Sequence, residues 1–534
     1  MKRKAVAAVL TAVMVASMFT GCGSDNGSSS AKSASAASAA SAANDTVDED
    51  GKVNGIMYQE GLPLVDEGDY TFSIFCDDSS ESGEFIMLDE FKKQTNVDVD
   101  LKIYPYETAT ERLNLDLNSG DYADVIGGWT LSDNAILTYG VNQGVFIPLE
   151  DYFEKYCPNI SAILDLPGVR EKMTAPDGHI YTIPYVCTDT TVGYSPYINT
   201  KWLENVGMSM PTTTDEFEAV LKAFKEQDAN GNGDASDEIP FSTDPNNKHI
   251  EAMAGYFGLP MNKLGIAIQN EKVVYGGVSD TYREFLSWFH KLYAEGLVDV
   301  ELYTQDSSTW EGKGNQDLYG VSIAYGSNEF TGIPAAEERG DFDSMPVLNT
   351  DKDGIWLRDT EGFSVYRTQA VITNKAEHPE IICRWFDNAF ALENGIGCNR
   401  GPVGVIVNKE DDGYHAIDTT TLSEEDQEKY SWGNLWPQSL PKYLPVDFEF
   451  VEEHPMYDET KEIIPSYWID LDKIDTFSDT NTAIKDFFEQ QQAQFVCGEL
   501  DIDNDADWQA YVDGMYSLGL EDWVATQGIE EIAK

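Results

Sequence analysis

The densest cluster of oxygen donors in this 534-residue sequence lies at positions 228–240. Asp228, Asn230 and Asn232 recur at every second position, so a tight loop can turn all three side chains toward one point. A glycine follows each asparagine, and glycine adopts the positive φ that such a loop requires. Carboxylate and amide oxygens are the ligands that Ca²⁺ prefers. The spacing therefore predicts a calcium-binding loop.

The loop matches the EF-hand pattern at its first, third, fifth and sixth positions but departs from it at the end. Its twelfth position is Ile239, where an EF-hand has a bidentate glutamate. Asp237 and Glu238, just before it, return two carboxylates to the same centre. We therefore expect a calcium loop that is not an EF-hand. The alternative is an Asx-rich surface turn without a metal ion.

The elements on either side would position this loop. Pro211–Phe217 contains an N-cap and a first helical turn, which predicts a helix that runs to about Gln227. The apolar segment from Pro240 follows the loop. An ion in the loop would then brace the exit of the helix against the next strand.

A second group of polar residues follows predicted strands near the N-terminal end of the chain. Strand patterns at 70–76, 97–103 and 123–126 alternate with helical patterns at 85–95 and 108–118. This order predicts a βαβαβ unit with a parallel sheet and helices on both faces. Ligands of such sheets bind beyond the carboxyl ends of the strands. Several acidic and aromatic residues lie there.

Aromatic rings beside carboxylates or amides suit a sugar, because rings cover its apolar face and polar groups bond its hydroxyls. For any single aromatic residue, the alternative is core packing or casual exposure. The candidates for sugar contacts are Asp77, Asp78, Trp129, Asp133 and Tyr185 near the first strands, and Tyr325, Asn328, Trp432 and Trp436 farther along the chain.

The N-terminus predicts export and an anchor. A basic start precedes an apolar run over Ala5–Phe19, which is too short to cross a membrane as a mature helix. The run ends at Phe19-Thr-Gly-Cys22, which resembles a bacterial lipobox with Phe in place of the usual Leu. Cys22 would then be lipidated; the alternative is an ordinary signal peptide that is cut elsewhere. Residues 23–50 are rich in Ser and Ala and predict a flexible tether.

The charge and the cysteine content argue against several kinds of partner and site. The formal net charge of −59 repels nucleic acid and anionic lipid, so we expect no nucleic-acid partner and membrane contact through the lipid anchor only. The six cysteines other than Cys22 are scattered, without a CxxC pair or a partnered histidine. This argues against a zinc site and favours mostly free thiols; disulfides among the six are the alternative.

Segments along nearly the whole mature chain resemble extracellular solute-binding lipoproteins of carbohydrate ABC importers, family 1 type. The resemblance includes calcium-containing proteins that bind alginate oligosaccharides. It rests on the order of these segments: Leu117–Val125, Phe146–Leu149, Ala175–Tyr181, Asn199–Leu203, Met210–Phe217, Asp228–Pro240, Phe495–Ile502 and Trp508–Tyr511.

The resemblance implies an α/β protein with a two-lobed periplasmic-binding-protein-like fold, hinge strands and C-terminal helices. It implies a signal peptide at 1–21, the lipidated cysteine and tether at 22–65, and a first lobe at 66–186, completed by about 370–395. The second lobe would span 187–369, and a mainly helical part at 396–534 would complete it. The lobes would close over the ligand by a hinge motion.

The resemblance also implies a ligand set, partners and a location. A structural Ca²⁺ would be held by Asp228, Asn230, Asn232, Asp237 and Glu238, with Asp234 in the backbone-carbonyl position. The protein would be a monomer on the extracellular face of a Gram-positive-type membrane, and would deliver a carbohydrate to ABC permease subunits.

Enzymatic alternatives find little support in motifs, because the sequence has no HExxH, GxSxG or P-loop pattern. We therefore expect a binding protein and not an enzyme. Abundant Asp and Glu leave a lipid-anchored glycoside hydrolase open, since such enzymes need only a carboxylate pair. A calcium-stabilised adhesin and a peptide-binding protein are further alternatives.

Overall fold

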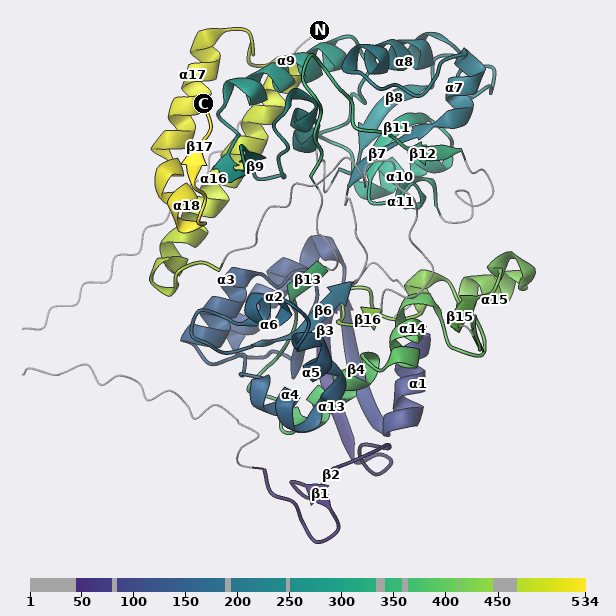
Figure 1. Cartoon of the computed structure of the whole chain (residues 1–534), viewed down its shortest axis with the longest axis vertical. Coiled ribbons are helices and arrows are strands. Elements are labelled where there is room, and N and C mark those ends of the chain that lie inside the picture. The colour runs from purple at the N-terminus through teal and green to yellow at the C-terminus, as the bar shows by residue number, and fades with distance from the viewer. Residues whose placement is uncertain are drawn as a thin grey trace, which may run out of the picture. The chain divides into compact units, whose positions relative to one another are not determined.

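The computed structural model describes residues 45–78, 84–187, 194–245, 250–332, 341–357, 364–411, 413–444 and 468–534 (Figure 1). The predicted signal peptide, Cys22 and most of the predicted tether lie outside these ranges. None of the helices in the described part of the chain combines the length and apolarity that crossing a bilayer requires.

The larger sheet has six strands in the order β16-β6-β13-β5-β3-β4. Its parallel part, β3, β4 and β5, confirms the three strands that the sequence predicts near the N-terminus. The strands and the two connecting helices are β3 (Tyr70–Asp77), α1 (Ile86–Thr95), β4 (Val97–Tyr104), α2 (Tyr106–Ser119) and β5 (Val125–Gly127).

Later parts of the chain return to this sheet. The long strand β13 (Ser364–Ile372) pairs antiparallel with both β5 and β6 (Thr182–Cys187), and β16 (Tyr443–Leu444) pairs parallel with β6. The resemblance implies that about 370–395 completes the first lobe, and Ala370–Ile372 of β13 pair with β5 in this sheet.

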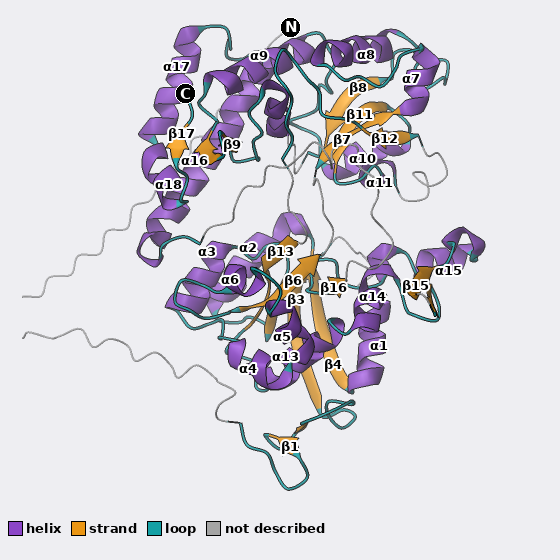
Figure 2. Cartoon of the chain, in the orientation of Figure 1, coloured by secondary structure: helices purple, strands orange, loops and turns teal. Residues whose placement is uncertain are grey.

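Helices cover the larger sheet on both faces (Figure 2). Along β3, Phe72, Ile74 and Cys76 belong to one apolar cluster, whereas Phe75 belongs to another. Alternate side chains point to opposite faces, so a strand buried on both faces reads as a nearly continuous apolar run. The surrounding helices are α3 (Asp133–Ala135), η2 (Ile136–Asn142), α4 (Glu150–Tyr156), α5 (Pro158–Leu164), α6 (Val169–Met173), α13 (Pro379–Ala389) and α14 (Leu392–Arg400).

The second sheet has four strands in the order β12-β7-β11-β8, of which β8 and β11 are parallel. The parallel pair leaves two carboxyl ends at one edge, as in the first sheet. The strands are β7 (Ser195–Asn199), β8 (Ile239–Thr243), β11 (Tyr319–Ala324) and β12 (Phe342–Ser344), and the adjoining helices are α7 (Thr200–Val206), α8 (Thr214–Glu226), α10 (Ser307–Asn315) and α11 (Asn328–Thr331).

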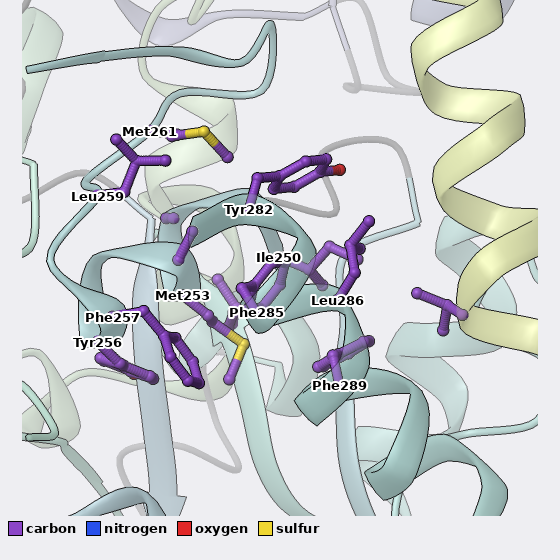
Figure 3. Packing of buried hydrophobic residues seen from close by; sticks show 14 of the residues in the cluster. Ile250, Met253, Tyr256, Phe257, Leu259, Met261, Tyr282, Phe285, Leu286 and Phe289 are labelled. Atoms are coloured by element: carbon purple, nitrogen blue, oxygen red, sulfur yellow. The ribbon is translucent and has the colours of Figure 1, made fainter. Parts of the chain in front are cut away.

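The largest core joins this second sheet to the C-terminal helices. Figure 3 shows part of it, where Tyr282, Phe285 and Phe289 of one helix pack near Met253. Phe488 and Trp523, from the C-terminal helices, belong to the same cluster. The elements are η3 (Ile250–Phe257), β9 (Ile266–Gln269), β10 (Lys272–Tyr275), α9 (Asp280–Ala294), α16 (Ile474–Cys497), α17 (Asp505–Ser517), α18 (Leu520–Thr526) and β17 (Glu531–Ile532).

Parts of the chain between 396 and 444 pack on the first sheet, whereas the resemblance implies that 396–534 completes the second lobe. Cys398, Trp436 and Leu440 are buried in a core cluster of the first sheet, and β16 extends that sheet. The reason is packing, because the Trp436 ring stacks on Trp385 at 5.7 Å. The domain boundaries themselves stay a prediction. Small elements complete this region: β14 (Val407–Glu410), β15 (Gly413–Ala416) and α15 (Glu424–Lys429).

Five cysteines are free thiols in the structure, in agreement with the expectation of mostly free thiols. Four of them are buried, and burial suits a thiol that acts as a small apolar side chain. They are Cys76, Cys157, Cys383 and Cys398, with Cys497 exposed.

Candidate functional site

Asp77, the last residue of β3, holds the turn that follows β5. Its fully buried carboxylate accepts hydrogen bonds from the Trp129 N–H at 2.9 Å and the Thr130 N–H at 2.6 Å. The turn passes so close that a Cβ on Gly128, which has φ 135°, would collide with this carboxylate. Burial raises the pKa of Asp77, and the two main-chain donors oppose that rise. Asp77 therefore positions Trp129 rather than lying open to a ligand.

Asp78 ties a distant loop to the same strand end. It is 3% exposed, and its Oδ2 accepts the Gln438 N–H at 2.7 Å. The Gln438 side-chain amide donates to the Trp436 carbonyl at 3.0 Å and accepts from Lys442 Nζ at 2.9 Å. Residues 436–442 thus lie at the carboxyl end of β3, a placement that local sequence patterns do not predict.

Three aromatic rings gather at this edge, and we name them the aromatic wall: Trp129, Tyr185 and Tyr366. Trp129 meets Tyr366 edge-on at 5.5 Å and Tyr185 at 6.1 Å, and the two tyrosine rings lie 5.5 Å apart. Trp129 is 44% exposed, which leaves a ring surface open for stacking. Sequence reasoning missed Tyr366, although its position in a strand that returns to this sheet is a usable signal.

Asp133 is committed to an ion pair. Arg367 donates from Nε to its Oδ1 at 2.8 Å and from Nη2 to its Oδ2 at 2.5 Å. The Arg367 guanidinium is only 6% exposed and lies 3.9 Å from the ring centre of Trp468. A bidentate pair of this kind is geometrically specific, so Asp133 is held in place by a residue that the sequence did not single out.

The edge of the second sheet carries a separate aromatic pair. Tyr325 follows β11, is 42% exposed and meets Tyr194 edge-on at 5.7 Å. Its main-chain N–H donates to Glu329 Oε2 at 2.9 Å. Asn328, the first residue of α11, is exposed beside it. The structure thus brings Tyr325 and Asn328 together, as the sequence suggested.

Two carboxylates, those of Asp244 and Glu329, also belong to this edge, and neither was predicted from the sequence. Asp244 directly follows β8, is 8% exposed and donates its N–H to the Ile323 carbonyl at 3.3 Å. Burial raises the pKa of Glu329 to about 7, and the negative charges of Asp244 and Glu311 add to the rise. Because β8 and β11 are parallel, their carboxyl ends share one edge. The strand-end rule applied to β8 is the signal that finds Asp244.

The two late tryptophans do not form a stacking surface. Trp436 is fully buried, and its indole N–H donates to the Leu440 carbonyl at 3.3 Å. It therefore belongs to the core, and its predicted contact with a ligand is wrong. The side chain of Trp432 lies outside what the structure describes.

The loop at 228–240 joins α8 to β8, as expected. Successive main-chain N–H groups donate to side chains of the loop: Asn232 to Asn230 Oδ1 at 3.0 Å, Gly233 to Asp228 Oδ2 at 3.0 Å, and Asp234 to Asn232 Oδ1 at 2.8 Å. Gly233 has φ 95°, which the tight curl requires. These side-chain acceptors hold the backbone of the loop in its tight curl.

Two carboxylate oxygens inside this loop lack partners. Asp228 Oδ1 and Glu238 Oε2 are buried and make no hydrogen bond, although Glu238 Oε1 accepts the Ala229 N–H at 2.8 Å. Burial raises the pKa of Glu238, and the charge of Asp237 adds to it. Buried orphan oxygens are rare, and a cation would satisfy both. The donor set therefore fits a divalent metal ion.

The remaining loop residues fit the same arrangement. The Asp237 carboxylate accepts from Asn232 Nδ2 at 2.7 Å and from Asn230 Nδ2 at 3.3 Å. The Asp234 carboxylate accepts a hydrogen bond from Ser236 Oγ at 2.6 Å. Within the described ranges, no three His, Cys, Asp or Glu side chains cluster as metal ligands, so the donor set depends on the asparagine amides.

The family match covers residues 78–395, which align with the bacterial extracellular solute-binding protein family. The chain belongs to this family. Its members are substrate-binding proteins of transporters and not enzymes, so this chain is not an enzyme. The two-lobed α/β fold that the sequence predicts is confirmed.

Curated relatives include a fructooligosaccharide ABC transporter substrate-binding protein, FusA of Streptococcus pneumoniae. It is 31% identical over 411 residues, which are 74% of this chain and 70% of the relative. Lipoprotein LipO of Bacillus subtilis is 25% identical over 79% of this chain and 84% of its own length.

Solved structures agree with these relatives. FusA in complex with kestose has a TM-score of 0.72 at 26% identity and covers 86% of this chain and 98% of its own. The same protein has been solved as an EF-hand mutant in complex with fructo-nystose. The alginate-binding protein AlgQ2, solved without calcium ion, has a TM-score of 0.69 at 22% identity over 88% of this chain and 99% of its own, and shares the fold.

Proposed function

We propose that this protein is the extracellular substrate-binding component of an ABC importer, which captures an oligosaccharide and delivers it to the permease. The single observation that carries this proposal is the half-exposed aromatic wall beside hydrogen-bonded carboxylates at the carboxyl edge of the first sheet. The name of FusA, a fructooligosaccharide-binding relative, supports the same class of ligand.

In this proposal the aromatic rings and the carboxylates at the sheet edges have separate roles. Trp129 and Tyr366 stack on the apolar face of a sugar ring, and Tyr325 offers a second ring from the other sheet. Asp77 and Asp78 hold the surrounding turns in place. The lobes, proposed at 66–186 with about 370–395 and at 187–369, would close over the ligand by hinge motion.

A binding screen tests the function. Purified protein is incubated with monosaccharides, neutral oligosaccharides and uronic-acid oligosaccharides, and thermal unfolding is followed for each. One class of sugar should raise the melting temperature, bind with one-to-one stoichiometry by calorimetry, and be recovered unchanged. Release of shorter sugars would favour a glycoside hydrolase instead. No shift with any sugar would favour an adhesin or a peptide-binding protein.

We also propose that the loop holds a structural Ca²⁺. The ligands would be Asp228, Asn230, Asn232, Asp237 and Glu238, with the main-chain carbonyl of Asp234. The two orphan oxygens support this assignment, since they need a positive partner. When bound, the ion would supply positive charge that fixes the exit of α8 against the start of β8. It would stabilise the fold without touching the sugar.

Chelation tests the calcium proposal. A chelator should lower the melting temperature, and added Ca²⁺ should restore it. The free energy of unfolding should rise by about 3 kcal/mol when the free ion exceeds its Kd about 100-fold. Asp228→Ala should abolish the response, whereas Asp234→Ala should keep it, because a main-chain carbonyl survives that change. An unchanged melting temperature of the wild-type protein after exhaustive chelation would contradict the assignment.

The anchor is part of the same proposal. We infer that Cys22 carries the lipid, and the relation to lipoprotein LipO supports this. The variant Cys22→Ser should appear in the culture medium, whereas the parent should remain with the cell membrane. Equal distribution of the two proteins would contradict the anchor.

A further inference from the structure

The carboxyl edge of the first sheet carries one more exposed ring, that of Tyr106. Strand β4 ends at Tyr104, which pairs with Asp77 at the end of β3, and the Asp78 N–H donates to the Tyr104 carbonyl at 3.3 Å. Tyr106 begins α2 two residues later and is 39% exposed. The strand register therefore places Tyr106 at the same edge as the aromatic wall.

The order of the strands puts the rings of this edge in one row. The row follows the strand order β6-β13-β5-β3-β4, with a ring at each strand except β3: Tyr185, Tyr366, Trp129 and Tyr106. Neighbouring strands lie about 4.8 Å apart, so the row extends over about 19 Å of the sheet edge. This length exceeds that of a single sugar ring.

Exposure distinguishes two kinds of ring within the row. Tyr185 and Tyr366 are half-buried, and Lys442 Nζ lies 5.9 Å from the ring centre of Tyr185. Trp129 is 44% exposed, close to the value for Tyr106. These two rings stand on either side of the end of β3 and offer the row's largest open surface for stacking.

The hydroxyl end of Tyr106 is held at the strand end while part of the ring stays open. Burial and the negative charges of Asp78 and Asp77 raise the pKa of this hydroxyl, and a hydrogen bond with the Trp129 side chain opposes the rise. A ring that is tied at its polar tip can stack on a ligand without losing much further freedom.

We propose that Tyr106 is a specificity-determining residue that extends the aromatic wall to a further sugar unit, so that the protein selects sugar chains over single sugars. This inference rests on the proposed function. A stacking ring adds affinity only when the ligand is long enough to reach it. Trp129 then contributes to the binding of every sugar, whereas Tyr106 contributes only to the binding of longer chains.

A chain-length series, measured by calorimetry, tests the inference. The series belongs to the sugar class that responds in the thermal screen: sucrose, kestose and nystose for fructans, maltose to maltotetraose for glucans, and di- to tetragalacturonate for uronic acids. Affinity should rise about tenfold at the step where the added unit reaches Tyr106. Equal affinity for all lengths, the monosaccharide included, would overturn the inference and leave the proposed function standing. Failure of every sugar to bind would overturn both.

Three variants test whether the ring of Tyr106 causes this step. Tyr106→Ala should remove the tenfold step and leave the affinity for the shortest sugar unchanged. Tyr106→Phe keeps the ring and should keep the step. Tyr516→Ala removes a ring that is 42% exposed on α17, and it should bind every sugar as the wild type does.

Melting curves check that all three variants are folded. The role of Tyr106 is overturned if Tyr106→Ala keeps the step or loses affinity equally for every chain length. Loss of the step in Tyr106→Phe would assign it to the hydroxyl and overturn the stacking role. Loss of the step in Tyr516→Ala would show that it does not depend on this edge, which would also overturn the inference.

Discussion

Both sheets end their parallel strands in buried carboxylates, but they surround these groups differently. At the first edge, Asp77 accepts two main-chain hydrogen bonds and Asp78 accepts one. At the second edge, Glu329 accepts one main-chain hydrogen bond and faces Asp244 and Glu311. Main-chain donors oppose the cost of burial, whereas like charges add to it. The first edge is therefore held by main-chain hydrogen bonds, whereas at the second edge burial and nearby negative charges raise the pKa of Glu329.

The aromatic residues follow the same division. Three rings support one another in the aromatic wall, and Trp129 owes its position to the turn that Asp77 holds. Tyr325 meets the Tyr194 ring edge-on at the other edge. We infer that the first edge contributes most of the stacking energy.

The largest expected effect is at Asp77. Asp77→Ala leaves the main-chain N–H groups of Trp129 and Thr130 without their acceptor, so the free energy of unfolding should fall by about 2–4 kcal/mol. Sugar binding should be lost as well, because the turn that carries Trp129 is released. Denaturant unfolding and calorimetry measure the two effects. Asp77→Asn keeps one acceptor oxygen, and an equal loss in that variant would contradict the hydrogen-bond explanation.

The second-largest expected effect is at Gly128, which packs against the Asp77 carboxylate. Gly128→Ala places a methyl group against Asp77 at a positive φ, and it should lower the free energy of unfolding by about 1–3 kcal/mol. Gly178 also has a positive φ, 93°, but has open space around it. If Gly178→Ala is equally destabilising, backbone strain and not the contact with Asp77 explains the result.

Removing the exposed rings of Trp129 and Tyr325 compares how much each sheet edge contributes to sugar binding. Trp129→Ala should weaken sugar binding about 10- to 100-fold, and Tyr325→Ala about tenfold, with little change in melting temperature. Titration calorimetry of both variants with the best sugar of the screen measures this. Binding by Trp129→Ala at the strength of the parent would place the sugar elsewhere.

The smallest effect concerns pH. The pKa of Glu329 is raised from its ordinary value of 4.5 to about 7, so protonation stabilises the fold. That contribution is present below about pH 4.5 and is lost as pH rises through 7. Glu329→Gln lacks this loss and should be more stable than wild type at pH 8 by about 1–2 kcal/mol. If the free energies of unfolding of the two proteins change equally between pH 5 and pH 8, the assignment is wrong.

Local patterns predicted much of the fold. The alternation of 70–76 and the helical spacing after it gave β3 and α1 at nearly the right bounds. The loop after α8 was also predicted, because its donors lie within eleven residues of one another. Such features depend on neighbours along the chain, and the sequence displays those directly.

Residues joined across the chain escaped prediction. Asp133 and Arg367 are 234 positions apart, and no local pattern links them. Tyr366 and Asp244 were missed because their strand neighbours come from other segments. Trp436 looked like Trp129 in the sequence, with polar neighbours and glycine nearby, yet one is buried and the other is 44% exposed.

The sequence by itself predicted the parallel unit near the N-terminus and the cluster of oxygen-bearing residues at 228–240, and its resemblance to a known family predicted the class of protein. The first two predictions follow from residue type and spacing, which act over a few turns of chain. Only the tertiary structure decided which carboxylates are satisfied by main-chain donors, which rings remain exposed and which oxygens of the loop are left without partners. Burial and hydrogen-bond satisfaction depend on atoms brought together from distant segments, and folding alone sets those contacts.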